Sequence, residues 1–305
     1  MRPMSSVAGP SETGPLIEVL LKHPSTAFVD EARVNGQWKS LGYSAPPDLR
    51  RAIDEYDHFA EIVQTAGAAI TWLPQDDGTT LDSVYVRDAA VVCARGLILC
   101  RMGKAARSGE PAALNHAWPA FGPDVLPIIG RIEAPGTLEG GDVAWLGPRT
   151  IAVGRGYRTN DHGIAQLRGL LGDSIDEMIV VPLPHWRGAG DVMHLMSIIS
   201  PVDRDLAVVY APLLPVPFRE RLVDLGIGMV EVPDEEFDSL GANVLALGPR
   251  RCLIARGNAR TVAALEKAGA EVIEYAGAEI SLKGAGGPTC LTRPLARRAV
   301  DVPGR

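Results

Sequence analysis

The sequence lacks the features that mark membrane, nucleic-acid-binding and disulfide-bonded proteins. No apolar run approaches the ~20 residues that a membrane-spanning helix needs, and no run of Lys and Arg stands out against a net charge of −7. Binding to a nucleic acid or to an anionic membrane surface is therefore not expected. The four cysteines are scattered without a CxxC pair, which argues against a zinc site and against a disulfide framework. A reducing cytoplasm suits such a chain.

The sequence does contain enough apolar residues for a large core, with 46% hydrophobic and 22% charged residues among 305. This length allows one large domain or two ordinary ones. Because no linker or low-complexity segment divides the chain, we expect a single domain over residues 15–300. Residues 1–14 are small and polar without the charged-then-apolar pattern of a signal peptide, and we expect them to form a disordered tail.

One unit recurs along the chain: two short apolar runs joined by a hairpin signal, then a helix and a further strand. Its first strands begin near residues 89, 143, 194 and 243, and a fixed period of about 50 residues is typical of propellers and closed rings. A strand at 17–21, a helix after Asp48 and a strand at 69–73 would complete a fifth unit with the C-terminal end. The other predicted elements, unit by unit, are strands 89–93, 97–101 and 125–129 with helix 111–118; strands 143–146, 150–153 and 177–181 with helix 163–171; strands 194–199, 206–210 and 228–232 with helix 217–225; and strands 243–247, 252–255 and 271–275 with helix 259–268.

Residues with chemically active side chains enter the first strand of each unit. In a pseudo-symmetric ring, equivalent positions cluster around the axis, so carboxylates, a histidine and a thiol would meet there. One further step of about 50 residues from the fourth unit reaches a cysteine that follows a glycine-rich loop, where a thiolate nucleophile could be delivered to a ligand. These residues are Asp82 and Asp88, then Glu139 and Asp142, then His194, Asn243 and Cys290.

Each of these residues also has a plainer interpretation. Asp82 could be a turn or cap residue, and Asp142 could be purely structural. His194 could be a core histidine, in which case His185 is the rival for a chemical role. Cys290 could be a small hydrophobic residue before a buried strand.

The motifs Glu139-Gly140-Gly141-Asp142, His194-Leu195-Met196-Ser197 and Gly286-Gly287-Pro288-Thr289-Cys290, in this order, resemble the guanidine-modifying superfamily. Its members include dimethylarginine dimethylaminohydrolases, arginine deiminases and amidinotransferases. The resemblance runs from about Leu16 to Leu295. It implies an α/β fold, a five-bladed α/β propeller of ββαβ units with pseudo-five-fold symmetry, which agrees with the repeat.

The resemblance also implies a mechanism and a set of catalytic residues. Cys290 would attack the central carbon of a guanidinium and form a covalent thiouronium intermediate. His194 would protonate the leaving amine and then deprotonate the attacking water, and Glu139 would orient the histidine. No metal and no organic cofactor is needed. The matched substrate-binding residues are Asp82 and Asp88 for the guanidinium, and Arg107 and Arg158 for the substrate α-carboxylate.

Three positions bear on which guanidine is the substrate. Asp82 follows the pattern of the dimethylarginine hydrolases, and Met196 stands where deiminases carry an Asp that bonds both free nitrogens. Arg87 departs from the hydrolase pattern toward the deiminase pattern and could meet an anionic group of the substrate. Ser197 beside Met196, and Leu41 at the start of a predicted lid over Leu41–Ala45, complete the expected substrate contacts.

We therefore expect a hydrolase that cleaves a C–N bond of a small substituted guanidine resembling dimethylarginine, giving an ureido product such as citrulline and an amine. An arginine deiminase or an amidinotransferase would use the same Cys, His and Glu. A non-catalytic binding protein on the same propeller is less favoured, because it would be expected to have lost them. A papain-like hydrolase requires its cysteine before its histidine, and the order here is reversed. A homodimer is left open.

Overall fold

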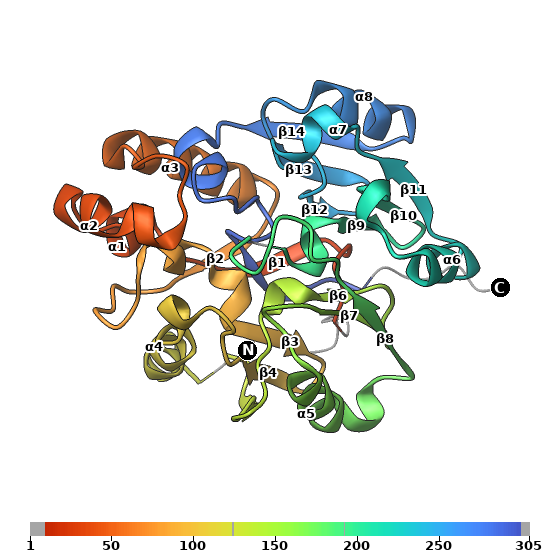
Figure 1. The fold of residues 1–305 in the computed structure, drawn as a ribbon, viewed down its shortest axis with the longest axis horizontal. Coiled ribbons are helices and arrows are strands. Elements are labelled where there is room, and N and C mark those ends of the chain that lie inside the picture. The colour runs from red at the N-terminus through yellow and green to blue at the C-terminus, as the bar shows by residue number, and fades with distance from the viewer. Residues whose placement is uncertain (1–9, 124, 192, 300–305) are drawn as a thin grey trace.

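The structure, a computed structural model, describes residues 10–123, 125–191 and 193–299. Five sheets of three strands each are arranged in a ring, with strands near the centre and helices outside (Figure 1). In each sheet the middle strand pairs antiparallel with the strand before it in the repeat and parallel with the strand after it. The five-bladed α/β propeller of ββαβ units that the sequence predicts is confirmed.

Each blade has its own strands and an outer helix. The blades are β3 (Ala90–Cys93), β4 (Gly96–Leu99) and β5 (Ile128–Arg131) with α4 (Glu110–Ala117); β6 (Val143–Trp145), β7 (Thr150–Arg155) and β8 (Glu177–Pro182) with α5 (Asp161–Leu171); β9 (Ile199–Asp203), β10 (Leu206–Val209) and β11 (Gly228–Glu231) with α6 (Val216–Asp224); β12 (Leu245–Gly248), β13 (Arg251–Ala255) and β14 (Glu271–Tyr275) with α8 (Ala259–Lys267); and β15 (Arg293–Arg297), β1 (Leu16–Leu21) and β2 (Ala69–Trp72) with α3 (Leu49–Thr65). Among the described residues, the other α-helices are α1 (Pro24–Ala27), α2 (Glu31–Leu41) and α7 (Asp234–Phe237), and a π-helical turn spans Ala278–Leu282.

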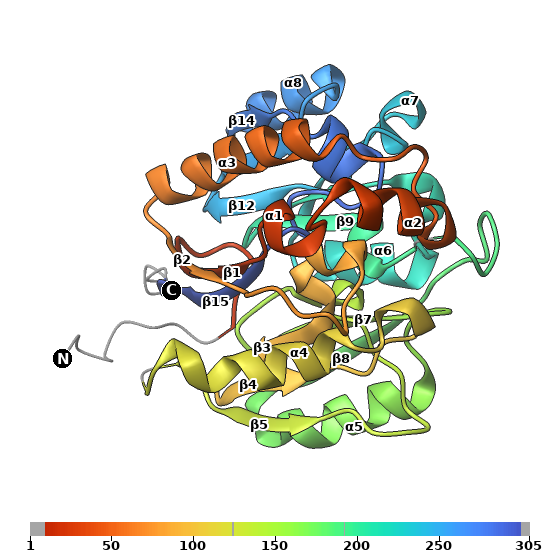
Figure 2. The same cartoon turned by 90° about the vertical axis from the view of Figure 1, so that its left-hand side faces the viewer.

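The fifth blade joins the two ends of the chain. β15 runs antiparallel to β1, with Leu20 opposite Arg293 and Val19 opposite Pro294. β1 then pairs in parallel with β2, and Figure 2 shows these three strands together beneath α3. The prediction that N-terminal and C-terminal segments complete one unit is therefore confirmed.

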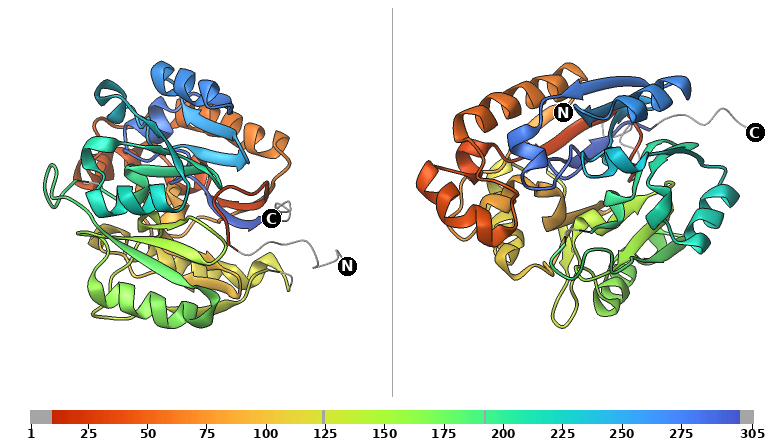
Figure 3. Two further views of the ribbon diagram at one scale, coloured as in Figure 1. Left: turned by 90° about the vertical axis from the view of Figure 1, so that its right-hand side faces the viewer. Right: turned by 45° about the horizontal axis from the view of Figure 1, so that its top comes forward.

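The tilted view in Figure 3 shows the helices lying around the outside of the ring of strands. In α3, Asp48 caps the first turn by accepting from Arg51 N, and Tyr56, Phe59 and Val63 are fully buried. Burying a side chain the size of Phe59 stabilises the fold by about 1.5–3 kcal/mol. Among the described residues, no helix combines the length and the apolar character that a membrane span requires.

Two predicted strands are displaced. The strand predicted at 194–199 begins at Ile199, and residues Leu195–Ser197 form a 3-10 turn in front of it. The strand predicted at 125–129 is β5, which begins at Ile128. In the first case the apolar run continues from the turn into the strand, so hydrophobicity alone does not separate them.

The prediction of a disordered tail over residues 1–14 is wrong for residues 10–14, the part that the structure describes. Residues 1–9 lie outside the described residues. Glu12, however, is only 6% exposed, and its Oε1 accepts from Nη2 of the fully buried Arg87 at 2.6 Å. A buried ion pair of this kind fixes the segment to the propeller.

Candidate active site

A pocket opens where the segments that precede the first strands of several blades (β3, β9 and β15) meet. Its free volume is about 20 Å³, room for about one water molecule. Chemically active side chains from the first, second, third and fifth blades line it. The lining residues are Asp82, Tyr85, Asp88, Lys104, Arg107, Arg158, His194, Gly284, Ala285, Gly286 and Cys290.

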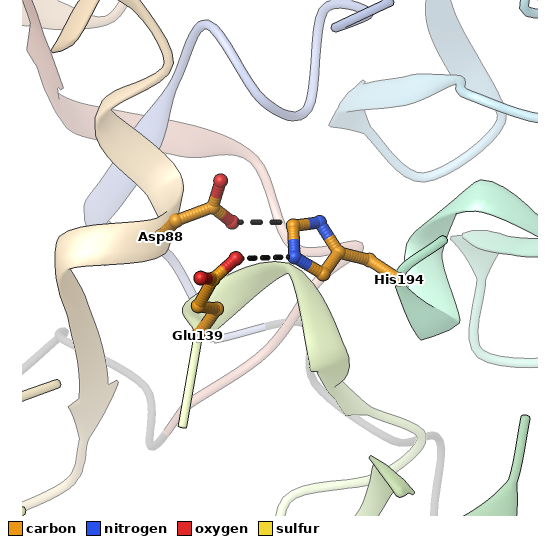
Figure 4. Close-up of side chains that lie close together, drawn as sticks. All are labelled: Asp88, Glu139 and His194. Atoms are coloured by element: carbon orange, nitrogen blue, oxygen red, sulfur yellow. Dashed lines mark hydrogen bonds and ion pairs between the residues drawn. The ribbon is translucent and has the colours of Figure 1, made fainter. Parts of the chain in front are cut away.

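His194 is held between two carboxylates, as Figure 4 shows. Its Nε2 lies 2.7 Å from Glu139 Oε2, and its Nδ1 lies 3.8 Å from Asp88 Oδ1. Glu139 is fully buried and also accepts from the backbone N of Gly103 and Lys104 at 2.9 and 3.0 Å. The backbone donors hold Oε1 of Glu139, which fixes the carboxylate and therefore Oε2, the atom that contacts His194. The imidazole therefore has one defined orientation.

The electrostatics of this group favour a protonated histidine. Burial alone would lower the pKa of His194, but the nearby carboxylates of Asp88, Asp142 and Glu139 raise it to about 9. Burial raises the pKa of Glu139, and the hydrogen bond and charge of His194 together with Arg107 and Arg158 outweigh this and hold it well below its usual range. At neutral pH the pair is therefore an imidazolium and a carboxylate, which makes His194 a ready proton donor.

The partners of Arg107 differ from those that its predicted role, binding the substrate α-carboxylate, would require. Its guanidinium donates to Asp88 through Nη1, to both oxygens of Glu110 at 2.8 Å, and to the Tyr85 carbonyl at 2.9 Å. With these partners it offers no free two-pronged face to a substrate carboxylate. Arg107 therefore holds Asp88 in position, and Arg158, which lines the pocket and donates to Glu139 at 3.2 Å, remains nearest to the predicted anion-binding role.

Lys104 lines the pocket and was not expected from the sequence. Its Nζ donates to Asp82 Oδ2 at 2.6 Å and to the Leu41 carbonyl at 2.7 Å. A lysine ammonium thus neutralises the carboxylate that was predicted to hold the guanidinium, and ties it to the start of the predicted lid. No spacing signal marks Lys104, because it lies outside the repeated positions.

The glycine-rich loop before Cys290 is shaped by close contacts. A Cβ at Gly286 would lie 2.3 Å from the Tyr85 ring, and one at Gly287 would lie 2.4 Å from Asn243 Oδ1. Among residues 284–287, only Ala285 has a positive φ, at 57°. The glycines are therefore required by close packing, and not by a left-handed backbone conformation.

Cys290 differs from the other cysteines by being partly exposed, whereas Cys93, Cys100 and Cys252 are buried. Its Sγ lies 3.6 Å from Asn243 Nδ2. Burial and the charge of Asp88 raise the pKa of Cys290 above its ordinary value, although the Thr289 hydroxyl and Arg87 act in the opposite direction. The resting site therefore contains a neutral thiol and a protonated histidine in the same pocket.

The repeated positions also link adjacent blades. In three blades, the side chain at this position accepts a hydrogen bond from a backbone N of the next blade, and a backbone bond joins the fifth blade to the first. Asp142 serves this purpose, which supports its structural interpretation. The bonds run from Gly141 N to Asp88 Oδ1 (2.8 Å), from Leu195 N to Asp142 Oδ1 (2.9 Å), from Thr289 N to Asn243 Oδ1 (3.0 Å) and from Arg87 N to Cys290 O (3.2 Å).

Four residues predicted to contact substrate do not line the pocket. The Arg87 guanidinium faces Glu12, so the interpretation of Arg87 as a contact for an anionic substrate group does not fit its placement. Met196 is buried in the apolar cluster of the third blade, so it forms no wall of the pocket. Ser197 Oγ accepts from the His194 backbone N at 3.1 Å, and Leu41 contributes its carbonyl to Lys104.

His185, the alternative histidine, lies elsewhere. It is exposed, and its Nδ1 is 2.6 Å from the Tyr157 hydroxyl. It does not line the pocket that contains Cys290. His194 is therefore the histidine that shares the pocket with the thiol.

Three residues of the site have the donor types of a metal centre. One ligand atom from each of Asp88, Glu139 and His194 lies within 4.8 Å of the others. Both carboxylates are already paired with guanidinium groups, Asp88 with Arg107 and Glu139 with Arg158. These arginines supply the positive charge that a metal ion would otherwise supply, so we assign no metal to the cluster.

Comparison with known proteins identifies the family. The arginine deiminase family model matches residues 81–220 and 219–297. An N(G),N(G)-dimethylarginine dimethylaminohydrolase of Streptomyces coelicolor is 32% identical over 223 residues, covering 73% of this chain and 78% of that protein. An arginine deiminase of Mycobacterium avium is 30% identical over 246 residues, covering 70% of this chain and 60% of that protein.

A solved structure gives the same result at the level of the fold. A dimethylarginine dimethylaminohydrolase of Pseudomonas aeruginosa, a cysteine-to-serine mutant complexed with citrulline, aligns with a TM-score of 0.74 and 25% identity. The alignment covers 92% of this chain and 99% of that chain. The chain therefore belongs to the arginine deiminase family within the guanidine-modifying (pentein) superfamily, and is an enzyme of the class that hydrolyses C–N bonds in amidines.

Proposed function

We propose that this enzyme hydrolyses a substituted guanidine resembling dimethylarginine, giving citrulline or a related ureido product and an amine. The observation that carries the proposal is that Cys290, His194 and two carboxylates line one pocket. The thiol is the nucleophile, the imidazolium is the acid, and Asp82 and Asp88 are the partners of the guanidinium. The relatives named above act on arginine derivatives according to their names.

The first half of the reaction forms a covalent intermediate. The substrate cation approaches Asp82 and Asp88, and its charge favours loss of the Cys290 proton to solvent, because the thiolate is stabilised beside a cation. The thiolate adds to the central carbon of the guanidinium. The C–N bond then breaks as His194 donates its proton to the leaving amine, and a thiouronium remains on sulfur.

The second half releases the product. A water molecule takes the place of the departed amine, and the neutral imidazole of His194 accepts its proton as the oxygen adds to the thiouronium carbon. The C–S bond breaks and returns the sulfur as a thiolate, and the second proton of the water passes to solvent, which leaves the neutral ureido product. Glu139 keeps the ring oriented and stabilises the imidazolium in both halves.

The number of carboxylates in the pocket favours a substituted guanidine. An unsubstituted alkylguanidinium presents five N–H groups, and dimethylation of one terminal nitrogen leaves three. Among the described residues that line the pocket, Asp82 and Asp88 are the carboxylates, with four oxygens between them. Since each already accepts from a lysine or arginine, this set suits the smaller number of donors.

A panel of guanidines tests the proposal. Arginine, monomethylarginine, asymmetric dimethylarginine, agmatine and guanidinoacetate are assayed for ureido product and for the released amine. We expect dimethylamine and citrulline from dimethylarginine, with little ammonia from arginine. Ammonia released faster from arginine would assign the enzyme as a deiminase, and transfer of the amidino group to added glycine or lysine would assign it as an amidinotransferase.

The nucleophile is tested separately with matched cysteine variants. Cys290→Ser should lose at least about a thousandfold in turnover, because a serine hydroxyl is a much weaker nucleophile. The buried Cys252→Ser should retain wild-type turnover. A haloamidine should add its mass at Cys290, and labelling at Cys93, Cys100 or Cys252 instead would refute the assignment.

A further inference from the structure

We propose that a second pocket, lined by Glu12, Arg293 and Arg297, binds a small oxyanion such as phosphate or a carboxylate. This pocket shares no lining residue with the pocket of Cys290. It is separate from the substrate site and does not depend on the proposed reaction.

The pocket and its surroundings hold more positive charge than Glu12 can balance. Arg293 and Arg297 line the pocket, and Arg87 lies behind it as the ion-pair partner of Glu12. Arg87, Arg293 and Arg297 are 0%, 4% and 4% exposed, and Glu12, the acidic residue that lines the pocket, is 6% exposed. Glu12 pairs with Arg87 at 2.6 Å. Three guanidinium charges against one carboxylate leave two buried positive charges without a counterion among the described residues. Such charges are costly unless an anion joins them.

The guanidinium groups also lack hydrogen-bond acceptors. Among the described residues, six of their buried nitrogens have no partner: Nε and Nη1 of Arg87, and Nε and Nη2 of both Arg293 and Arg297. One donor of Arg297, Nη1, does bond the Gly14 carbonyl at 2.6 Å. Buried donors are nearly always satisfied, so a set of six unpaired donors indicates a missing acceptor. An oxyanion supplies several acceptor atoms at once.

The acidity of the arginines agrees with this deficit. Burial and the neighbouring charge of Arg87 lower the pKa of Arg293 to about 9 despite the opposing effect of Glu12. Burial and Arg87 likewise lower the pKa of Arg297 to about 10. A bound anion would oppose both effects by adding negative charge beside the guanidinium groups.

The cavity has room for the ligand. Its volume is about 60 Å³, which at ~10–15 Å³ for each water corresponds to about four to six water molecules. Trp145, Cys93 and Leu295 supply apolar walls beside the arginines. Such walls lower the local dielectric constant and strengthen the attraction between an anion and the guanidinium groups.

The proposal is tested by calorimetric titration of the full-length enzyme with inorganic phosphate and, in a second arm, acetate, at constant ionic strength set with chloride. We expect saturable binding of at least one of the two and a matching rise in Tm. Arg297→Gln should weaken binding by about tenfold or more, because it removes a charged hydrogen-bond donor. Glu12→Gln should tighten it, because the carboxylate repels the anion. Arg256→Gln, which changes an exposed arginine, is the matched control and should bind as the wild type does.

Two outcomes would overturn the proposal. One is the absence of saturable heat from both anions. The other is an equal response in Arg297→Gln and Arg256→Gln, which would indicate a general salt effect. If Arg297→Gln does not fold, Glu12→Gln decides the matter, since unchanged or weaker binding in that variant contradicts an anion beside Glu12.

Discussion

The two pockets are both built from buried charges, but they balance those charges in opposite ways. At the pocket of Cys290, the two lining carboxylates and the adjoining Glu139 each have a cationic partner: Lys104 for Asp82, Arg107 for Asp88, and Arg158 with His194 for Glu139. At the second pocket, the one lining carboxylate, Glu12, is paired with the neighbouring Arg87, and the lining arginines Arg293 and Arg297 have no carboxylate partner among the described residues.

This difference suits the first pocket to holding catalytic groups in fixed positions and the second to binding a charged ligand. A fully paired set of charges has its geometry fixed before substrate arrives, which is what catalysis by oriented groups requires. An unpaired set leaves donors free, so it gains most from a ligand that carries the missing charge. The following predictions test whether the two pockets respond differently when single charges are removed.

Among the charged residues around the two pockets, the largest effect is expected at Glu139, on activity and on its pH dependence. Glu139→Gln should lower kcat by about a hundredfold or more, because the proton donor loses its orientation and its counter-charge. In the wild type, donation by His194 should fail as pH rises through about 9. In the variant the pKa moves toward the ordinary value of about 6.5, so activity should decline at lower pH. The measurement is kcat against pH, and an alkaline limb that does not move would contradict the assignment.

The same shift has a consequence for stability. The folded pKa of His194 is raised to about 9, so the folded state binds this proton more tightly than the unfolded state does. The resulting stabilisation is complete below about pH 6.5, the unfolded value, and is lost as pH rises to about 9. Urea unfolding of the wild type between pH 6 and pH 9.5 should show this loss, and Glu139→Gln should reduce it.

Removal of Arg107 should affect stability more than removal of any arginine in the second pocket. Arg107→Met leaves Asp88 and Glu110 buried without their main partner, and breaking such a pair costs about 3–5 kcal/mol. The free energy of unfolding in urea measures the cost. A loss below about 1 kcal/mol would mean that the paired charges of the catalytic pocket are not held by Arg107.

A smaller effect on stability, but a clear one on activity, is expected at Gly141. A Cβ there would lie 2.6 Å from both Asp88 Oδ1 and His194 Nδ1. Gly141→Ala should therefore displace both side chains, and a shift of ~1 Å can cost about a hundredfold in rate. Gly169→Ala is the matched control: Gly169 lies in α5 with nothing within 4 Å of its Cβ position. That variant should keep full kcat and gain about 0.5–1 kcal/mol of stability.

The smallest effect is expected at Arg293. Arg293→Met removes a buried charge whose Nε and Nη2 have no partner among the described residues. In buffer without phosphate or acetate, the change should be neutral or stabilising by about 1 kcal/mol, since replacing an uncompensated buried charge by an apolar side chain is often favourable. A loss as large as that of Arg107→Met would remove the distinction between the two pockets.

Periodicity predicted the ring well because each blade repeats one buried pattern. It did not predict α2, although local signals exist: Asp30 caps its start by accepting from Arg33 N, and Gly42 ends it with a φ of 88°. The helix has few buried residues, Val34 and Leu41, so its apolar pattern is weak. A helix held by its caps and by contacts from distant segments gives little periodic signal.

The positions of the site residues were predictable from register, but their partners were not. Equivalent positions in the repeat placed Asp88, His194 and Cys290 at one end of the axis. Lys104 pairs with Asp82 and Arg107 with Asp88, and both cations lie outside the repeated positions. No spacing rule therefore identifies which cation pairs with which carboxylate. Glu12 lies far from Arg87 in sequence, so a pairing that corrects the expected tail depends on the closed ring.

The pairing of β1 with β15 makes chemical competence depend on completion of the chain. Cys290 precedes β15 by only a few residues, and β15 has its partner at the start of the propeller. During synthesis, the edge of β1 that pairs with β15 stays unpaired until β15 has been made. A chain that stops before β15 lacks the strand that holds Cys290 in the pocket of His194. Truncated copies should therefore be inactive and should not react partially with the guanidine.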